Sequence, residues 1–276
     1  MSPQPRRLAD LSGGRACAAP LARAAEWALG LDAVNGCYGR IGGRGLGVGA
    51  FSEAALQDLG VSVDIQPQDL ERLRGVRGPC LVLANHPLGG RDALALLHLL
   101  SQARSDFRLM ANRLLGAIPE VAPSLILVDP FGRQGSAAFN LGPMRQARQW
   151  LSQGGLLGLF PAGEVSLWQG QEGRVADKAW SSQAVRLARA SGATLLPLHI
   201  SGATSHWLQA LARVHPLLKT PFLAREMMHG PARALRLTLG RPLPASALPH
   251  PQDPGAAAAW MRRQAYLLDP LPALRA

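Results

Sequence analysis

The sequence has few features of a membrane-spanning, secreted or disulfide-rich protein. No apolar run reaches the roughly 18 residues that a spanning helix needs. Its three cysteines, Cys17, Cys37 and Cys80, are too few for a disulfide framework and lack the spacing of metal ligands. Arg15 and Arg23 interrupt the apolar residues near the N-terminus, which argues against a secretory signal. We therefore expect neither a spanning helix nor a leader, and a reducing compartment such as the cytoplasm.

Acidic residues and lysines are also scarce. Asp and Glu number 18 against 29 Lys and Arg, which gives a net charge of +11. Only two of the basic residues are lysines, Lys178 and Lys219. An arginine-rich positive surface suits nucleic acid, anionic lipid headgroups or acidic substrates. Aromatic residues make up only 5% of the chain and no nucleic-acid-binding motif is present, so nucleic acid is the less favoured partner.

The apolar residues predict an α/β protein. They make up 47% of the 276 residues, enough for a sizeable core. Short apolar runs predict strands and helically spaced apolar residues predict helices. We predict strands at 80–84, 124–128, 156–160, 194–200 and 235–239, and helices at 19–31, 92–103, 143–152, 179–190 and 256–268. This alternation favours a largely parallel central sheet flanked by helices, preceded by an N-terminal helical segment.

Two segments lie outside this alternation, the N-terminal 50 residues and residues 205–228. We divide the chain into an N-terminal helical and glycine-rich segment, residues 1–50, which could contact a membrane, and a main domain, residues 51–276. The glycines at 42–49 partly match a dinucleotide fingerprint, but no strand precedes them, so a flexible connector is favoured. Residues 205–228 mix tryptophan and leucine with basic residues, which fits either an interfacial amphipathic segment or a helix pair over the core.

The sequence Asn-His-Pro-Leu-Gly-Gly-Arg-Asp occupies residues 85–92, directly after the first strand of this alternation. Sites in parallel sheets lie beyond the carboxyl ends of strands. His86 and Asp92 could form a pair in which the carboxylate orients the imidazole as a general base. The N–H groups of Gly89 and Gly90 could stabilise an oxyanion. The other interpretation is a buried turn in which Asp92 only caps the helix.

A second segment, Phe-Pro-Ala-Gly-Glu-Val-Ser, occupies residues 160–166 at the end of another predicted strand. Its proline and glycine predict a sharp turn at the same edge of the sheet. Glu164 could bind a polar group of a substrate or a basic side chain. An ordinary turn between a strand and a loop also explains this segment.

Together the two segments resemble the glycerophospholipid acyltransferases of the 1-acylglycerol-3-phosphate O-acyltransferase type. The resemblance is closest to the bacterial branch labelled hemolysin-like. That branch has an Asn-His-Pro-x-Gly-Gly segment before its acid and a Phe-Pro-Ala-Gly-Glu-Val-Ser block. The resemblance also takes in residues 128–132, 177–180 and 196–202, and it covers about residues 50–245 in the same order.

This resemblance implies acyl transfer from a thioester to a hydroxyl. His86 would deprotonate the acceptor hydroxyl, Asp92 would orient His86, and N–H groups near Gly89, Gly90 or Gly163 would stabilise the oxyanion. No bound cofactor and no metal are implied, and the acyl donor would be acyl carrier protein or coenzyme A. The residues implied for substrate binding are Asn85, Arg91, Arg133, Phe160, Pro161, Glu164, Ser166 and Lys178, with Arg133 as the candidate for a headgroup anion.

The chain departs from the wider family at two points. The wider family has four residues between its histidine and aspartate, whereas five separate His86 from Asp92, and the two glycines between them could absorb the extra residue. The wider family's third block reads Phe-Pro-Glu-Gly-Thr-Arg-Ser, with Glu and Arg where this chain has Ala162 and Val165. A headgroup contact common in makers of phosphatidic acid is therefore absent, which favours another acceptor, for example a lyso-aminolipid.

The resemblance also implies where the protein acts and with which partners. We expect a lyso-lipid acceptor, a thioester donor and an anionic membrane surface, with peripheral attachment to the cytoplasmic face of the inner membrane and no nucleic acid. His98 and His199 are expected to be structural. The alternatives are a non-catalytic lipid-binding relative, an acyl-thioester hydrolase whose base activates water, and a basic nucleic-acid-binding protein.

Overall fold

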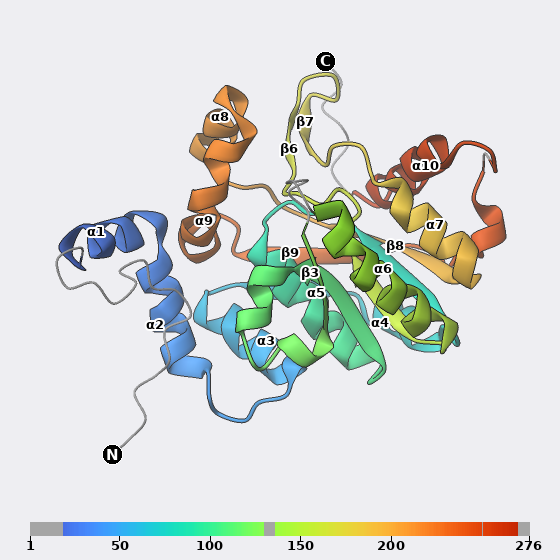
Figure 1. Cartoon of the computed structure of the whole chain (residues 1–276), viewed down its shortest axis with the longest axis horizontal. Coiled ribbons are helices and arrows are strands. Elements are labelled where there is room, and N and C mark those ends of the chain that lie inside the picture. The colour runs from blue at the N-terminus through green and yellow to red at the C-terminus, as the bar shows by residue number, and fades with distance from the viewer. Residues whose placement is uncertain (1–18, 130–135, 250, 270–276) are drawn as a thin grey trace.

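Seven strands form one mixed sheet through the middle of the computed structural model, which describes residues 19–129, 136–249 and 251–269 (Figure 1). Across the sheet the order is β1 (Ser62–Ile65), β9 (Ala234–Leu239), β8 (Thr194–Ile200), β2 (Cys80–Ala84), β5 (Leu156–Leu159), β3 (Phe107–Asn112) and β4 (Leu125–Val128). The five strands from β8 to β4 are mutually parallel, β9 is antiparallel to β8, and β1 is parallel to β9. This arrangement confirms the predicted largely parallel sheet.

Strand β2 is buried on both faces, which explains its unbroken apolar sequence. Because successive side chains point to opposite faces, Val82 packs into one core and Leu81 and Leu83 into the other. Leu83 pairs with Leu159 of β5 on one side and with Pro197 of β8 on the other. The carboxyl ends of the three central strands therefore lie side by side, and the loops that follow β2 and β5 emerge next to each other.

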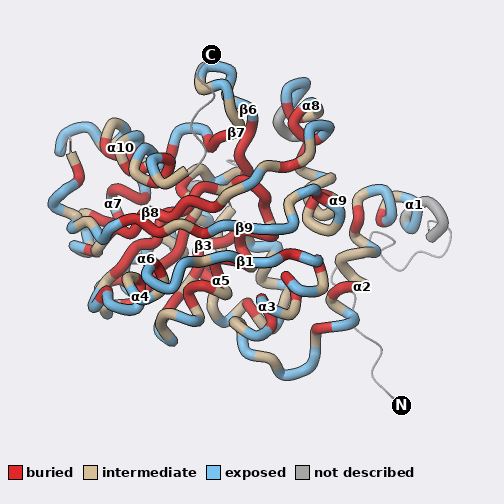
Figure 2. Tube along the Cα trace, turned by 180° about the vertical axis from the view of Figure 1, so that it is seen from behind, coloured by how far each residue is buried: buried red, intermediate tan, exposed pale blue. Residues whose placement is uncertain are grey.

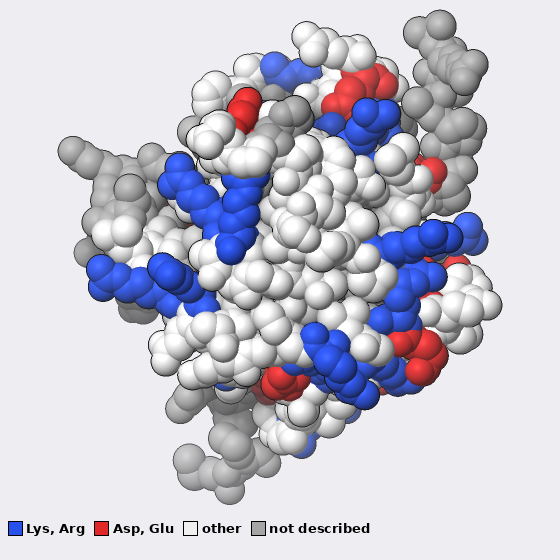
Figure 3. Space-filling view, turned by 90° about the vertical axis from the view of Figure 1, so that its right-hand side faces the viewer, with Lys and Arg blue, Asp and Glu red and all other residues white. Residues whose placement is uncertain are grey.

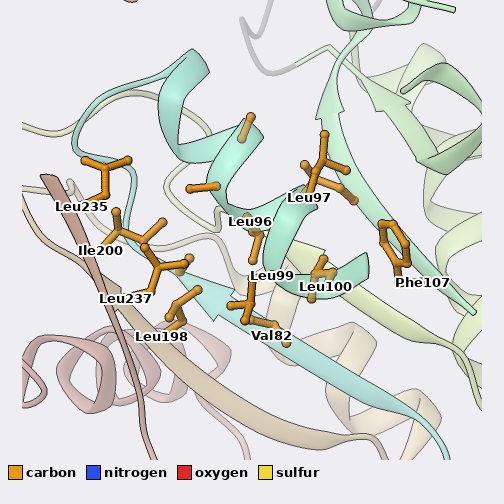
Figure 4. Close-up of a cluster of buried hydrophobic side chains, with 14 of the residues drawn as sticks. Val82, Leu96, Leu97, Leu99, Leu100, Phe107, Leu198, Ile200, Leu235 and Leu237 are labelled. Carbon is orange, nitrogen blue, oxygen red and sulfur yellow. The ribbon is translucent and has the colours of Figure 1, made fainter. Parts of the chain in front are cut away.

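Helices cover both faces of the sheet. The core of one face is closed by α3 (Val48–Asp58), α4 (Pro67–Gly75) and α5 (Gly90–Ala103), and that of the other by α6 (Ser136–Ser152), α7 (Ser182–Ser191) and α10 (Pro254–Tyr266). Figure 4 shows the leucines of α5 above Val82, Leu198 and Leu237 of the sheet. Figure 2 shows that buried residues are concentrated along the central strands. A rigid double core thus supports the loops at the carboxyl edge.

The N-terminal segment differs from the expectation of one helix over residues 19–31. It forms two helices, α1 (Ala19–Leu29) and α2 (Leu31–Ile41), separated at Gly30. Gly30 has φ +76°, and a Cβ there would lie 2.5 Å from the Cα of Arg225, so the chain turns where a distant segment packs against it. The expected boundary at residue 50 falls within α3, and the division into two parts stays a prediction.

A long connection between β8 and β9 packs beside the N-terminal helices (Figure 1). It contains α8 (His206–Val214), the 3₁₀ helix η4 (Pro216–Phe222) and α9 (Leu223–His229). Leu208 and Ala212 of α8 are buried, whereas Trp207 and Val214 are exposed. The segment therefore covers part of the protein, as one of the two sequence interpretations expects, and it also presents apolar side chains outward; the interfacial interpretation stays a prediction.

Other elements escaped the sequence analysis. Strand β1 alternates exposed Ser62 and Asp64 with half-buried residues, as befits an edge strand, and short apolar runs do not reveal it. Helix α6 begins seven residues before the predicted start at Pro143, and Asn140 in its first half exchanges two hydrogen bonds with the backbone of Asp129 after β4. The remaining elements not predicted are the helices α3 and α4, strand β3, η2 (Arg113–Ala117), η3 (Ala122–Ser124), the hairpin of β6 (Leu167–Gln169) and β7 (Arg174–Ala176), and η5 (Ala245–Ala247).

Candidate active site

Two loops that are far apart in the sequence meet at the carboxyl edge of the sheet. One follows β2 and contains His86, and the other follows β5 and begins at Phe160. The two rings stack, with centroids 4.1 Å apart and planes inclined by 21°. The backbone N–H of Ser166 donates a hydrogen bond of 2.8 Å to the carbonyl of His86. The second loop therefore contacts both the ring and the backbone of His86.

His86 and Asp92 are in direct contact. His86 Nδ1 lies 3.0 Å from Asp92 Oδ2, and the same oxygen accepts N–H bonds from Leu88 at 2.7 Å and Gly89 at 3.0 Å. Gly89 adopts φ +71°, which folds the chain back so that the carboxylate reaches the ring across five intervening residues. The long spacing therefore keeps the His86–Asp92 contact, and Asp92 also closes the first turn of α5.

The surroundings of the pair suit a base with one reactive nitrogen. Asp92 is fully buried, and this burial raises the pKa of its carboxyl, while the hydrogen bonds from His86, Leu88 and Gly89 favour the charged form. The side chain of His86 keeps 17% of its surface exposed. With Nδ1 turned to Asp92, Nε2 is the nitrogen left to exchange a proton with a bound molecule.

The backbone of His86 is held by a second carboxylate, Asp177, which the sequence analysis did not place in the site. Asp177 Oδ1 accepts the N–H of His86 at 3.1 Å and the hydroxyl of Ser166 at 2.5 Å. Asp177 Oδ2 accepts the indole N–H of Trp180 at 2.8 Å. The resemblance at residues 177–180 was the available signal, since it contains both Asp177 and Trp180.

Asp177 is itself anchored by α10. Its backbone N–H donates to the hydroxyl of Tyr266 at 2.7 Å, and its carbonyl accepts two N–H bonds from Arg262. Burial, the largest of several influences, raises the pKa of Tyr266, so its hydroxyl stays protonated near neutral pH. A chain of contacts thus runs from the C-terminal helix to the backbone of His86.

The three glycines expected to stabilise an oxyanion are in different situations. Gly89 donates its N–H to Asp92, and Gly163 donates its N–H to the carbonyl of Phe160 at 3.0 Å. Gly90 opens α5, and the first N–H groups of a helix have no acceptor within it. Gly90 is therefore the one of the three best placed to donate to a bound oxyanion.

Asn85 and Arg91, two residues expected to bind substrate, make their hydrogen bonds within the protein. The amide of Asn85 exchanges two hydrogen bonds with the backbone of Ile200 on β8. Arg91 is buried and donates to the carbonyls of Met227, Gly230 and Ala232. These contacts correct the expectation for Arg91: its guanidinium fixes the segment after α9 and does not face an open headgroup site.

Pro161 and Ser166, which were also expected to bind substrate, make hydrogen bonds within the protein. The carbonyl of buried Pro161 accepts the N–H of Ser181 at 2.9 Å, and Ser166 is the link to Asp177 described above. Both therefore shape the loop after β5. Arg133, the candidate for a headgroup anion, lies outside the described residues.

Glu164 holds two ammonium groups at the tip of the same loop. Its Oε1 lies 3.0 Å from Nζ of Lys178 and its Oε2 lies 3.2 Å from Nζ of Lys219. Lys219 also donates a hydrogen bond of 2.9 Å to the carbonyl of Val165. Burial tends to raise the pKa of Glu164, but the hydrogen bonds and charges of the two lysines outweigh it and lower that pKa overall. Lys219 lies far from Glu164 in the sequence and was not predicted here.

Two further histidines lie away from this site. His98 on α5 contacts the side chain of Gln102, one turn further along that helix, and the carbonyl of Gly49 on α3. His199 on β8 is buried edge-on against Tyr266, and burial lowers the pKa of its imidazole. In the part of the chain that the structure describes, no group of three or more His, Cys, Asp or Glu side chains is arranged to hold a metal ion.

Comparisons with known proteins agree on one family. The family model described as "Acyltransferase" matches residues 45–271. A lyso-glycine lipid O-acyltransferase of Phocaeicola vulgatus is 30% identical over 79% of this chain and 77% of its own, and one of Bacteroides thetaiotaomicron is 27% identical over 79% of each. The crystal structure of the 1-acyl-sn-glycerophosphate acyltransferase PlsC from Thermotoga maritima shares the fold, with a TM-score of 0.53 and 17% identity over 81% of this chain and 79% of that one.

The His86–Asp92 contact predicts which imidazole nitrogen carries the proton. In the neutral ring we expect Nδ1–H donating to Asp92 and a bare Nε2. Nitrogen-15 NMR of labelled protein distinguishes the two tautomers, and Asp92→Ala should shift His86 toward the Nε2–H form that free imidazole side chains prefer. A wild-type ring with its proton on Nε2 would contradict the proposed orientation. The His98 signals serve as an internal control.

Proposed function

Because the chain belongs to the acyltransferase family, we propose that it transfers a fatty acyl chain from a thioester donor to the hydroxyl of a lyso-lipid. The observation that carries this proposal is the His86–Asp92 pair at the carboxyl edge of the sheet, with Nδ1 held 3.0 Å from the buried carboxylate. A base oriented in this way removes a proton from a hydroxyl and needs no covalent intermediate on the protein.

The reaction follows from that geometry. Nε2 of His86 takes the proton of the acceptor hydroxyl as its oxygen attacks the thioester carbonyl carbon. The carbonyl oxygen becomes an oxyanion, and in this proposal the N–H of Gly90, in the first turn of α5, donates a hydrogen bond to it. The carbon–sulfur bond then breaks, and His86 returns its proton to the leaving thiolate. The products are an ester and a free thiol.

Asp92 has a positioning and an electrostatic role in this scheme. It fixes the ring so that Nε2 faces the substrates, and its charge stabilises the imidazolium that forms when His86 takes the proton. Asp177 and Ser166 hold the backbone of His86 from the other side. The base is therefore held in place before a substrate binds, which avoids reorganisation during the reaction.

The acceptor proposed here is a lyso-aminolipid. Two relatives are named lyso-glycine lipid O-acyltransferases and match most of the chain. The departures at Ala162 and Val165 point the same way, because the arginine that the wider family offers to a phosphate is absent. Acyl carrier protein and coenzyme A are both retained as donors, since either presents the same thioester.

We also propose that the protein attaches peripherally to an anionic membrane, on the cytoplasmic face of the inner membrane. Within the described residues, no helix has the length and apolar character to cross a bilayer. Trp27 of α1 and Trp207 of α8 are 65% and 45% exposed, and Arg225 lies over the ring of Trp27. Exposed tryptophan beside arginine suits a lipid headgroup region. On the side where α7 and α10 lie, Lys and Arg form separate groups among uncharged residues, several of them beside Asp or Glu (Figure 3).

Acyl transfer by the purified protein tests the catalytic proposal. Labelled acyl-carrier-protein and acyl-coenzyme A donors would be combined with a panel of lyso-lipids that includes lyso-aminolipids and lysophosphatidate. We expect transfer to at least one acceptor, reduced about 10²- to 10⁴-fold by His86→Ala, because general-base catalysis contributes that much. His98→Ala, a histidine on the same segment of chain but outside the site, should retain activity.

Four results would contradict this proposal. Transfer unaffected by His86→Ala would mean that another residue is the base. Release of free fatty acid at the same rate with and without acceptor would identify a hydrolase. Vesicle binding without turnover on any donor and acceptor would identify a non-catalytic lipid-binding protein. Salt-sensitive binding to nucleic acid would favour a nucleic-acid-binding protein.

Binding to vesicles tests the membrane proposal. We expect the full chain to sediment with vesicles containing anionic phospholipid. The double variant Trp27→Ala and Trp207→Ala should bind at least about tenfold more weakly, since burying large apolar side chains contributes more than ~1.4 kcal/mol. Leu267→Ala is the control, because Leu267 is 65% exposed beside α10. Equal binding by the double variant and the control would show that α1 and α8 do not face the bilayer.

A further inference from the structure

The only two lysines of the chain converge on one glutamate beside the candidate base. Lys178 follows β7, Lys219 lies in η4, and Glu164 lies in the loop after β5. Both Nζ atoms lie within 3.2 Å of the Glu164 carboxylate. The other 27 of the 29 Lys and Arg residues are arginine. Arginine therefore supplies most of the positive charge, and the two lysines call for a separate explanation. Lysine differs from arginine in being a compact point charge with three rotatable donors.

The position of the cluster relates it to the reacting groups. Gly163 precedes Glu164 and bonds to Phe160, whose ring stacks on His86. Ser166 follows two residues after Glu164 and bonds to the carbonyl of His86. Lys178 directly follows Asp177, which accepts the N–H of His86. Glu164 and Lys178 therefore each lie within two residues of a group that touches the base, and Lys219 joins them through Glu164.

Burying the ammonium group of Lys219 in this cluster costs free energy. Lys219 is 4% exposed, and burial lowers the pKa of its ammonium against the opposing effect of Glu164. Removing an ammonium group from water is unfavourable unless a charged partner and hydrogen bonds compensate. Glu164 and the carbonyl of Val165 accept two of its three N–H donors. Lys178 stays about half exposed, so its ammonium can also reach a bound molecule.

The charges of the cluster indicate the ligand. Two ammonium groups and one carboxylate leave a net charge of +1, which matches a single negative charge. Val165 occupies the place of the arginine that the wider family carries, and Lys219 reaches the carbonyl of that same residue. A glycine joined to a lipid through its nitrogen ends in a carboxylate with one negative charge. A phosphate monoester carries about −1.5 to −2 at pH 7.

We propose that the Lys178–Glu164–Lys219 cluster binds the carboxylate headgroup of the acceptor, and that Glu164 disfavours phosphate by cancelling one of the two ammonium charges. This inference rests on the proposed acyl transfer and names the headgroup chemistry of that site. Lys178 contacts the carboxylate directly. Lys219 fixes Glu164 and adds the second positive charge from beneath the loop.

Two lyso-lipids with the same chain and acceptor hydroxyl, one ending in a carboxylate and one in a phosphate monoester, provide the test. The wild type should have the higher kcat/KM on the carboxylate. Lys178→Met should raise KM for that substrate about tenfold with little change in kcat, because the headgroup lies away from the reacting bond. Glu164→Gln should shift the ratio of kcat/KM at least tenfold toward the phosphate.

Controls separate this inference from misfolding and from the proposed function. Arg236→Met breaks an exposed ion pair with Asp64 on the sheet edge and should change neither substrate's kinetics. Thermal unfolding of each variant shows whether it is folded, and the exposed Lys178→Met keeps the test valid if a Glu164 variant unfolds. Equilibrium binding of both lyso-lipids to His86→Ala protein measures headgroup preference without turnover.

The outcomes are distinct. Absence of transfer by wild type with every donor and acceptor overturns the proposed function, while the binding measurement still tests the cluster. Transfer with an unchanged headgroup ratio in Glu164→Gln and Lys178→Met, or a wild type that prefers phosphate, overturns the cluster's role alone. Tighter binding of carboxylate by wild type, lost in Lys178→Met and kept in Arg236→Met, supports it.

Discussion

The candidate site is arranged around one buried carboxylate oxygen, Oδ2 of Asp92. It accepts N–H bonds from Leu88 and Gly89 and contacts Nδ1 of His86, so the loop, the helix start and the imidazole converge on a single acceptor. Burial opposes ionisation of Asp92, and these neighbours favour it. A proton taken up by His86 would give the carboxylate a full positive partner, which is the condition under which a buried charge is best compensated. The same contact thus orients the ring and stabilises the state that the proposed reaction creates.

That contact would be of little use if the histidine were mobile. The register of β2 between β5 and β8 brings the loop after β5 against the loop of His86. Phe160 packs on the ring, while Asp177 accepts the backbone N–H of His86 and Ser166 donates to its carbonyl. Tyr266 of α10 then secures Asp177. The residues that hold the site follow β2, β5 and β7 or lie in α10, and all of them lie within residues 45–271, which match the family model.

The features of the fold and site that depend on short stretches of sequence could be predicted. The unbroken apolar strands 80–84 and 194–200, and the positions of His86 and Glu164 just beyond strand ends, follow from hydrophobic burial and parallel topology. Side-chain contacts between residues far apart in the chain could not be predicted from the sequence. Nothing around Lys219 indicates that it reaches Glu164, and Asp177 gives no local sign that it accepts the N–H of His86. Arg91 was misjudged for the same reason, since its three acceptors lie in a segment about 140 residues away. Edge strand β1 escaped because its exposed polar residues interrupt the apolar pattern.

The central claim is that His86 and Asp92 act as one unit in acyl transfer. A double-mutant cycle on kcat/KM for transfer tests it most directly, with His86→Ala, Asp92→Ala and the double variant compared at matched folding. Residues that work as a unit give strongly non-additive losses. We predict that the double variant is no slower than His86→Ala alone, because Asp92 acts only through the imidazole. Losses that multiply in the double variant would show that the two residues act independently, and would contradict this account of the site.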